Sequence, residues 1–200
     1  MGGFPSSTTH IAMDKETFTT TYYPMAQQAG ARFGLNPEVI LAQAAVESGW
    51  GSSYGARVRK NFFGITAAGS PNEFWDGSYT VGQNSYALKF RVYKSAQDSF
   101  YDFARLISSK YKSALAVSHD STAYAKAISQ SAYIAEANGD SREGYRKAII
   151  ASAASIADVI KKKGLAIVQS PAGISTGALL LVGLAGWLWY RRNRKKRNGI

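Results

Sequence analysis

The chain has 200 residues, of which 46% are hydrophobic and 18% charged, a composition that suits one globular domain with an appendage. It contains no cysteine and only two histidines, which excludes a disulfide framework, a thiolate metal site and a histidine-rich metal cluster. The formal net charge is +11, but a basic run near the C-terminus carries more than half of it. We therefore expect neither a metal nor another cofactor.

The first helix can be predicted from its boundary residues. Residues 1–13 have neither the basic start nor the apolar core of a signal peptide, and we expect a flexible N-terminus there. Asp14 is a suitable N-cap for a helix over residues 15–33, and Gly34 is a suitable stop.

A second helix is predicted from Pro37 to about Ser48. Its start combines a capping side chain, a proline at the first helical position and an acid in the first turn, in the order Asn36-Pro37-Glu38. Its apolar residues recur at helical spacing and indicate one buried face, formed by Val39, Ile40, Ala42 and Val46.

Residues 61–93 differ from the helical segments. They are rich in glycine and aromatic residues, and the segment YALKFRVY alternates partly, as a half-buried strand does. We predict a small β-hairpin lobe here, followed by three more helices over about 95–110, 121–131 and 142–162. The expected fold class is mostly α (α+β), with one domain over residues 14–163.

The C-terminal segment has the pattern of a membrane anchor. Residues 164–172 contain glycine, serine and proline and are predicted to be a linker. Residues 173–190 carry no charge and approach the ~20 residues needed to span a bilayer. Trp187 and Trp189 lie where an interfacial aromatic belt belongs, and the basic tail 191–200 would be cytoplasmic. The alternative is a buried C-terminal helix.

Glu47 is the first candidate for chemistry. Gly49 ends the predicted helix, so Glu47 falls in its last turn, where the helix dipole is negative. Trp50, and in space Phe62 and Phe63, would desolvate the carboxyl group and raise its pKa further. An acid with a raised pKa in an aromatic cleft can protonate a glycosidic oxygen. Chemistry alone leaves open that Glu47 is a solvent-facing residue at a helix end.

The segment around Glu47 resembles a known signature. LAQAAVESGWGSS followed by NFFGI is similar to the motif of glycoside hydrolase family 73, which comprises bacterial glucosaminidases that hydrolyse peptidoglycan. Asn61, Phe63 and Gly64 match its N-x-F-G-I element. FRVYKSAQDSFYDFARLI resembles the family's strand and following helix, and AYIAE resembles its tyrosine-bearing loop. The resemblance covers residues 14–163 and implies a lysozyme-like fold, in which helices and a small β-lobe flank a groove.

The resemblance implies roles for the matched residues. Glu47 is the expected general acid. Glu73 best resembles the second acid of the β-lobe, which positions water or stabilises positive charge, and Asp76 competes for that role. Tyr133 is expected to line the groove, and Glu136 to be a third acid, although NGDSREG after it departs from the family's shorter link. Five residues are expected beside the substrate, namely Ser48, Trp50, Asn61, Phe63 and Asp76. For Trp50, packing at the helix end is the preferred alternative.

The implied reaction is hydrolysis of the β-1,4 bond after N-acetylglucosamine in the glycan strands of peptidoglycan. Inverting, retaining and substrate-assisted mechanisms all stay open, because the sequence gives no distance between carboxylates. A lytic transglycosylase and a non-catalytic peptidoglycan-binding protein are the alternatives. No nucleic-acid partner is expected, because the basic tail adjoins an apolar span instead of a nucleic-acid-binding module. The oligomeric state is not indicated.

Anchor and enzyme together predict a hydrolase that faces peptidoglycan, either in a bacterial envelope or in the membrane of a bacteriophage virion as a lysin. One further motif, Gly51-Ser52-Ser53-Tyr54-Gly55, fits the G-x-S-x-G pattern of serine hydrolases. That pattern requires a strand before the serine, whereas a helix is predicted there.

Overall fold

The computed structural model describes residues 13–82, 87–134 and 141–165. The predicted membrane span 173–190 and the basic tail 191–200 lie outside these residues, as do Glu136 and most of the linker. Within the described ranges, no helix is both long and apolar enough to cross a membrane.

The described part of the chain contains seven helices and two short strands. Their order is α1 (Lys15–Phe33), α2 (Pro37–Ser48), α3 (Tyr54–Arg59), β1 (Tyr79–Val81), β2 (Lys89–Arg91), α4 (Ala96–Lys110), α5 (Lys112–Ala116), α6 (Ser121–Ser129) and α7 (Arg142–Lys163). The prediction of a mostly helical domain with a small β-lobe is confirmed. The sequence did not indicate α3 and α5, because helices of 6 and 5 residues are too short to show a period.

Capping side chains start the first two helices at the predicted residues. Asp14 Oδ1 accepts a hydrogen bond from the Thr17 N–H over 2.7 Å, and Asn36 Oδ1 accepts one from the Glu38 N–H over 2.8 Å. Helix α1 ends at Gly34, whose φ of 75° is left-handed and therefore favours glycine. Both helix predictions are confirmed, including the boundaries.

Helix α2 is buried on almost every side, whereas the sequence predicted one buried face. All side chains from Val39 to Ala45 are buried, and the helix packs against α1, α6 and α7. Burial of one large aliphatic side chain contributes roughly 1.5–3 kcal/mol. The helix that carries Glu47 is therefore the centre of the hydrophobic core.

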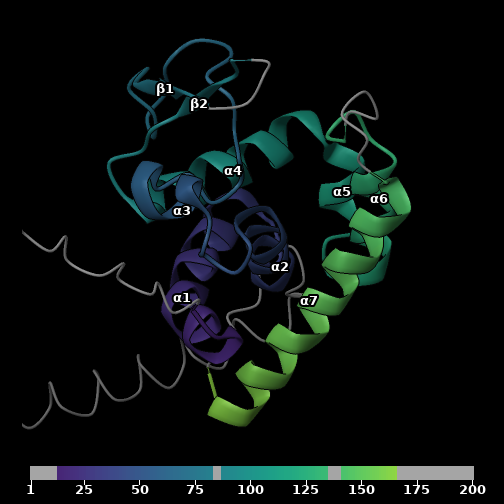
Figure 1. Cartoon of the computed structure of the whole chain (residues 1–200). Coiled ribbons are helices and arrows are strands. Elements are labelled where there is room, and N and C mark those ends of the chain that lie inside the picture. Colours follow the sequence, from purple (N-terminus) through teal and green to yellow (C-terminus); the bar gives the residue numbers. More distant parts are fainter. Residues whose placement is uncertain (1–12, 83–86, 135–140, 166–200) are drawn as a thin grey trace, which may run out of the picture.

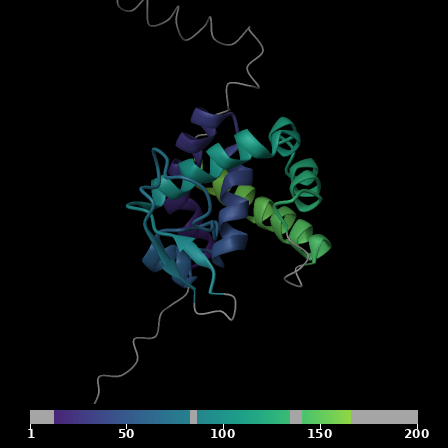
Figure 2. The same ribbon diagram turned by 90° about the horizontal axis from the view of Figure 1, so that it is seen from above.

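The elements form two sides around α2. Figures 1 and 2 show the β-lobe and α3 on one side of the molecule and α5 and α6 on the other, with α4 running between them. Helix α7 packs along α2, α6 and α1. Strands β1 and β2 are antiparallel, with Thr80 opposite Phe90.

A buried ionic cluster fastens the β-lobe to α4. Arg91 at the end of β2 donates to Asp102 Oδ2 over 2.6 Å, and the Asp102 side chain is 1% exposed. Tyr93 and Asn72 donate to the same carboxylate over 2.8 and 3.1 Å, and Arg105 donates over 2.8 Å. A buried carboxylate is costly unless it is paired and hydrogen-bonded. The four donors therefore stabilise both the charge and the placement of the lobe.

We predict that Asp102→Asn lowers the free energy of unfolding by about 3 kcal/mol, because Arg91 would lose its counter-charge while it remains buried. Urea unfolding followed by circular dichroism measures the change. Glu143→Gln is the control, because it breaks an exposed ion pair with Arg146. If both variants unfold at the same urea concentration, the cluster does not hold the lobe.

Candidate active site

Glu47 lies in the last turn of α2, where a hydrogen-bonded cap ends the helix. Gly49 has a left-handed φ of 57°, and its N–H bonds to the carbonyl groups of Ala45 and Val46. The Trp50 N–H also bonds to the Ala45 carbonyl, over 2.8 Å. This cap keeps the last turn from fraying, so Glu47 has a fixed position at the edge of the core.

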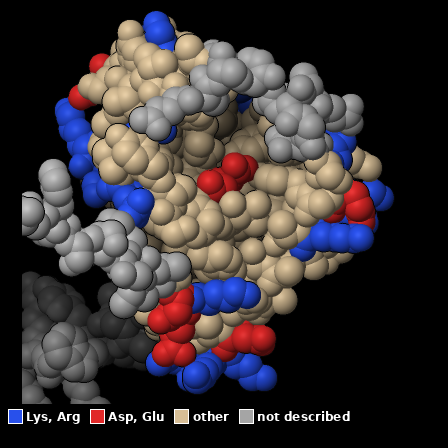
Figure 3. Space-filling view, in the orientation of Figure 1, with Lys and Arg blue, Asp and Glu red and all other residues tan. Residues whose placement is uncertain are grey.

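Glu47 lines a cavity of about 470 Å³ that is open to the surface. The other lining residues come from α2, α4, α7 and the connecting segments, and they are Val46, Phe63, Gly64, Ile65, Thr66, Leu106, Tyr111, Tyr133, Ile134 and Tyr145. Among these described residues Glu47 is the single acid. Figure 3 shows a hollow on this face, with an acidic group inside it and uncharged residues around it.

The Tyr145 hydroxyl group donates a hydrogen bond to Glu47 Oε1 over 2.5 Å. Tyr145 lies near the start of α7, which brings it to the end of α2. Burial raises the pKa of Tyr145 well above its usual value, and the neighbouring Tyr133 and Glu47 raise it further. The hydroxyl group therefore keeps its proton at ordinary pH and holds the Glu47 carboxyl group in one orientation.

The charge of Glu47 acts on two more buried tyrosines. Burial raises the pKa of Tyr133 well above its usual value, and the charge of Glu47 adds to this rise. Burial and then Glu47 also raise the pKa of Tyr124. Tyr133 lines the cavity, and its ring meets Phe103 and Tyr111 edge-on at 6.4 and 5.6 Å between centroids. Tyr133 and Tyr145 therefore line the Glu47 cavity as neutral side chains.

Asn61 and Phe63, both predicted to bind substrate, shape the wall of the cavity. Asn61 is buried, and its Nδ2 donates to the carbonyl oxygens of Ile65 and Arg91 over 2.9 and 3.1 Å. Phe63 stacks on Phe103 with 3.9 Å between ring centroids, and it lines the cavity. The side-chain amide of Asn61 is thus used in hydrogen bonds to the backbone, whereas the Phe63 side chain forms part of the cavity surface.

Ser48 and Trp50 form hydrogen bonds and packing contacts at the end of α2. The Ser48 side chain is fully buried, and its Oγ donates to the Ala44 carbonyl and accepts from the Gly51 N–H over 2.8 Å. These two hydrogen bonds engage the Ser48 hydroxyl group within the helix end, and its role in substrate binding stays a prediction. Trp50 packs edge-on against Phe18 at 5.4 Å, in line with the packing alternative.

The structure does not bring the predicted second acid to the Glu47 cavity. Glu73 is exposed and pairs with Arg32 of α1 over 2.5 Å. Glu73 and Asp76 line a separate cavity of about 170 Å³. Glu136 lies outside the described residues. The identity of the second acid therefore stays a prediction.

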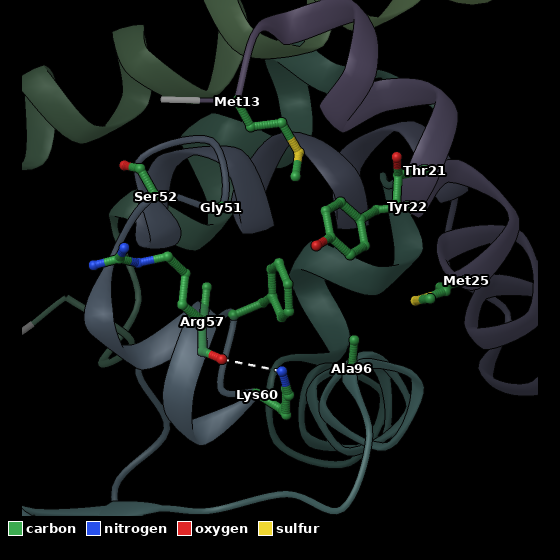
Figure 4. Close-up of a pocket in the computed structure, with 11 residues that line it drawn as sticks. Met13, Thr21, Tyr22, Met25, Gly51, Ser52, Arg57, Lys60 and Ala96 are labelled. Atoms are coloured by element: carbon green, nitrogen blue, oxygen red, sulfur yellow. Dashed lines mark hydrogen bonds between the residues drawn. The ribbon is translucent and has the colours of Figure 1, made fainter. Parts of the chain in front are cut away.

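A larger cavity of about 600 Å³ lies between α1, α3 and the start of α4 (Figure 4). Its lining is mainly apolar, and its charged residues are Arg57 and Lys60. No carboxyl group occurs in this lining, so the cavity does not supply a general acid. Phe62, which was predicted to desolvate Glu47, faces this cavity instead.

Ser53, the serine of the G-x-S-x-G pattern, has a structural role. It follows a helix instead of a strand, and its Oγ accepts a hydrogen bond from the Ala56 N–H over 3.1 Å as the N-cap of α3. Among the described residues there is no cluster of three or more histidine, aspartate or glutamate side chains placed to hold a metal ion.

Tyr145 and Tyr124 are not apparent as site residues from the sequence. Helical periodicity predicts α6 and α7 but does not tell which of their residues meet α2. The available signal was the position of Tyr145 just after a helix start, next to the loop that carries Tyr133.

Fold and site together define a class of protein. A lysozyme-like helical domain carries an acid at the end of a buried helix, inside a tyrosine-lined cavity, where a carboxylic acid can protonate a glycosidic oxygen as in glycoside hydrolases. Residues 23–163 match the family model Glucosaminidase, described as mannosyl-glycoprotein endo-beta-N-acetylglucosaminidase. The chain belongs to this glucosaminidase family, glycoside hydrolase family 73.

Several curated relatives are similar in sequence. Peptidoglycan hydrolase FlgJ of Vibrio parahaemolyticus is 31% identical over 132 residues, which cover 59% of this chain and 42% of the relative. FlgJ of Pseudomonas aeruginosa is 33% identical over 118 residues, or 50% and 28% of the two chains. A probable N-acetylmuramidase of Lactococcus lactis is 36% identical over 96 residues, or 46% and 22%. The chain thus spans less than half the length of these relatives.

Solved structures share the fold. The glycoside hydrolase domain of Salmonella typhimurium FlgJ has a TM-score of 0.58 and 24% identity, covering 76% of this chain and 94% of that domain. A peptidoglycan hydrolase mutant from Sphingomonas sp. A1 has a TM-score of 0.55 and 22% identity, covering 74% and 99%. At this identity the likeness supports the fold alone.

The buried tyrosines predict a loss of stability in alkaline solution. Tyr124, Tyr133 and Tyr145 hold their protons more tightly in the folded chain than in the unfolded chain, where the tyrosine pKa is about 10. Their contribution is therefore fully present below about pH 10 and decreases as the pH rises above it. Tyr145→Phe should lessen this decrease, whereas Tyr79→Phe, at an exposed position, should not.

Urea unfolding at about pH 8 and about pH 11 measures this difference, because only the higher value lies above the tyrosine pKa of the unfolded chain. An equal alkaline loss in Tyr145→Phe and the unchanged chain would contradict the prediction.

Proposed function

We propose that the chain is a peptidoglycan hydrolase that cleaves the β-1,4 bond after N-acetylglucosamine, with Glu47 as the general acid. The observation that carries the proposal is the 2.5 Å hydrogen bond from Tyr145 to Glu47, inside a cavity with one acid among its described lining residues. Family membership and the peptidoglycan hydrolase relatives support the substrate class.

The geometry suits acid catalysis of glycoside cleavage. Protonated Glu47 gives its proton to the glycosidic oxygen, the bond from C1 to this oxygen breaks, and the leaving sugar departs as an alcohol. Water then adds to C1, where positive charge had developed, and its proton passes to a carboxylate. Tyr145 supports the first step because it fixes the direction in which Glu47 presents its proton.

The second carboxylate is proposed to be Glu73, with Asp76 as the competing residue, and Glu136 is proposed as a third acid. Participation of the substrate's acetamido group is the alternative, and it needs no carboxylate as nucleophile. The two carboxyl groups of an inverting enzyme are about 6.5–9.5 Å apart, with a water molecule between them. In the described structure Glu73 pairs with Arg32, so it would have to leave this ion pair to act with Glu47.

We predict that the full chain, purified in mild detergent, releases glycan fragments from purified peptidoglycan, and that Glu47→Gln releases none. An amide keeps the shape of the carboxyl group but gives no proton. Borohydride reduction and mass spectrometry should find reduced N-acetylglucosamine ends.

The sugar found at the ends of the released fragments also distinguishes the alternative activities. Anhydro-muramic ends would assign the chain to the lytic transglycosylases, and reduced muramic ends would agree with the name of the Lactococcus lactis relative. Binding without cleavage by either form would indicate a non-catalytic peptidoglycan-binding protein.

We also propose that residues 173–190 anchor the hydrolase in a bilayer, with residues 191–200 on the cytoplasmic side. The support is the sequence pattern: an uncharged span, aromatic residues at its end and then six basic residues within 191–197. The membrane would be that of a bacterial envelope or of a phage virion, and either would hold the domain within a short tether of peptidoglycan.

For the anchor, we predict that the full chain sediments with membranes and that Leu180→Arg/Leu181→Arg does not. One arginine at the centre of a span costs roughly 2.5–3.5 kcal/mol on insertion scales. A chain that ends at residue 165 serves as the soluble control. Sedimentation of the arginine variant with membranes would contradict the span, and detection in purified phage particles would identify the virion as its location.

A further inference from the structure

A buried glutamine lies one turn before the general acid on α2. The Gln43 side chain is fully buried, four residues from Glu47 and on the same side of the helix. The hydroxyl group of Tyr124, which is also fully buried, donates to Gln43 Oε1 over 2.6 Å. The amide oxygen of Gln43 therefore has a hydrogen-bond donor, the Tyr124 side chain of α6.

The nitrogen end of the same amide is not satisfied. Gln43 Nε2 is buried and has no hydrogen-bond partner among the described residues. Buried polar groups without a partner are rare in folded proteins, and those that occur often belong to functional sites. Because the Gln43 oxygen already accepts from Tyr124, the amide nitrogen Nε2 must be the donor end, and it has no acceptor within hydrogen-bonding distance in the described part of the chain.

The candidate acceptor for Nε2 is the hydroxyl group of Tyr133. Burial and the charge of Glu47 raise the pKa of Tyr133, and the Gln43 side chain opposes this rise, as a donor to the tyrosine oxygen does. Tyr133 lines the cavity together with Glu47. A hydrogen bond from Nε2 to the Tyr133 oxygen would complete a directed chain of hydrogen bonds.

We propose that Gln43 is a positioning residue, which donates from Nε2 to the Tyr133 oxygen and thereby turns the Tyr133 proton into the Glu47 cavity. The order of donation runs from Tyr124 to Gln43, from Gln43 to Tyr133 and from Tyr133 to an oxygen of the bound sugar. Each hydroxyl group has one proton, so fixing the first donor fixes the direction of all that follow. This inference rests on the proposed function, because it assigns the last acceptor to the glycan.

The opposite direction is the competing arrangement. If the amide were turned, Nε2 would donate to Tyr124 and the Tyr133 proton would point to Gln43, away from the sugar. Removal of Gln43 would then free the Tyr133 proton for the substrate, and activity would be kept or increased. The two directions therefore predict opposite effects of one substitution.

The test is a double-mutant cycle of Gln43→Met and Tyr133→Phe in the full chain, read as kcat/KM on peptidoglycan. Met keeps the approximate volume but cannot donate, so Gln43→Met should lower kcat/KM about tenfold, the size of one net hydrogen bond. The double variant should be no less active than Tyr133→Phe alone, because Gln43 acts through Tyr133. Gln97→Met is the matched control, a half-buried glutamine on α4 whose amide donates to the Met25 carbonyl over 3.2 Å.

A second measurement does not depend on turnover. In the Glu47→Gln background, Gln43→Met should weaken binding of a soluble N-acetylglucosamine oligomer about tenfold when Tyr133 is present, and should leave binding unchanged when Tyr133→Phe is also present. Unchanged binding and activity, or losses that multiply in the double variant, would overturn the role of Gln43. Absence of cleavage by the unchanged chain, together with the expected binding pattern, would reject the proposed reaction and keep the positioning role.

Discussion

The end of α2 is the constraint on which the site depends. The helix is enclosed by α1, α6 and α7, so its last turn cannot shift without disturbing the core. The left-handed Gly49 and the buried Ser48 hydroxyl group close this turn with hydrogen bonds. A carboxyl group at this position keeps its place while the rest of the cavity is built around it, which is what a general acid requires.

The walls of the cavity are held by separate interactions. On one side, the buried carboxylate of Asp102 fixes the β-lobe through Arg91, Tyr93 and Asn72. On the other side, α7 packs on α2 and brings Tyr145 to Glu47. The cavity therefore depends on two separate attachments to the same helical core.

Most polar side chains around the Glu47 cavity are tyrosine hydroxyl groups, and Glu47 is the single charged residue among its described lining residues. Burial keeps Tyr124, Tyr133 and Tyr145 protonated, so they act as neutral donors near Glu47. A neutral donor can orient a carboxyl group or a sugar oxygen without adding a second charge in a poorly solvated space. The buried Gln43 amide accepts a hydrogen bond from Tyr124 at its oxygen, and its nitrogen is the proposed donor to Tyr133.

The sequence by itself determined the local features: the caps at Asp14 and Asn36, the stop at Gly34, the extent of α2 and the place of Glu47 in its last turn. These depend on neighbours within a few residues, whose preferences are visible in the chain. Only the tertiary structure decided that Ser48 and Asn61 form hydrogen bonds within the fold, that Glu73 pairs with Arg32, and that Tyr145 reaches Glu47 from 98 positions away. The physical reason is that periodicity shows which residues share a helix face, whereas packing between distant elements determines what that face meets.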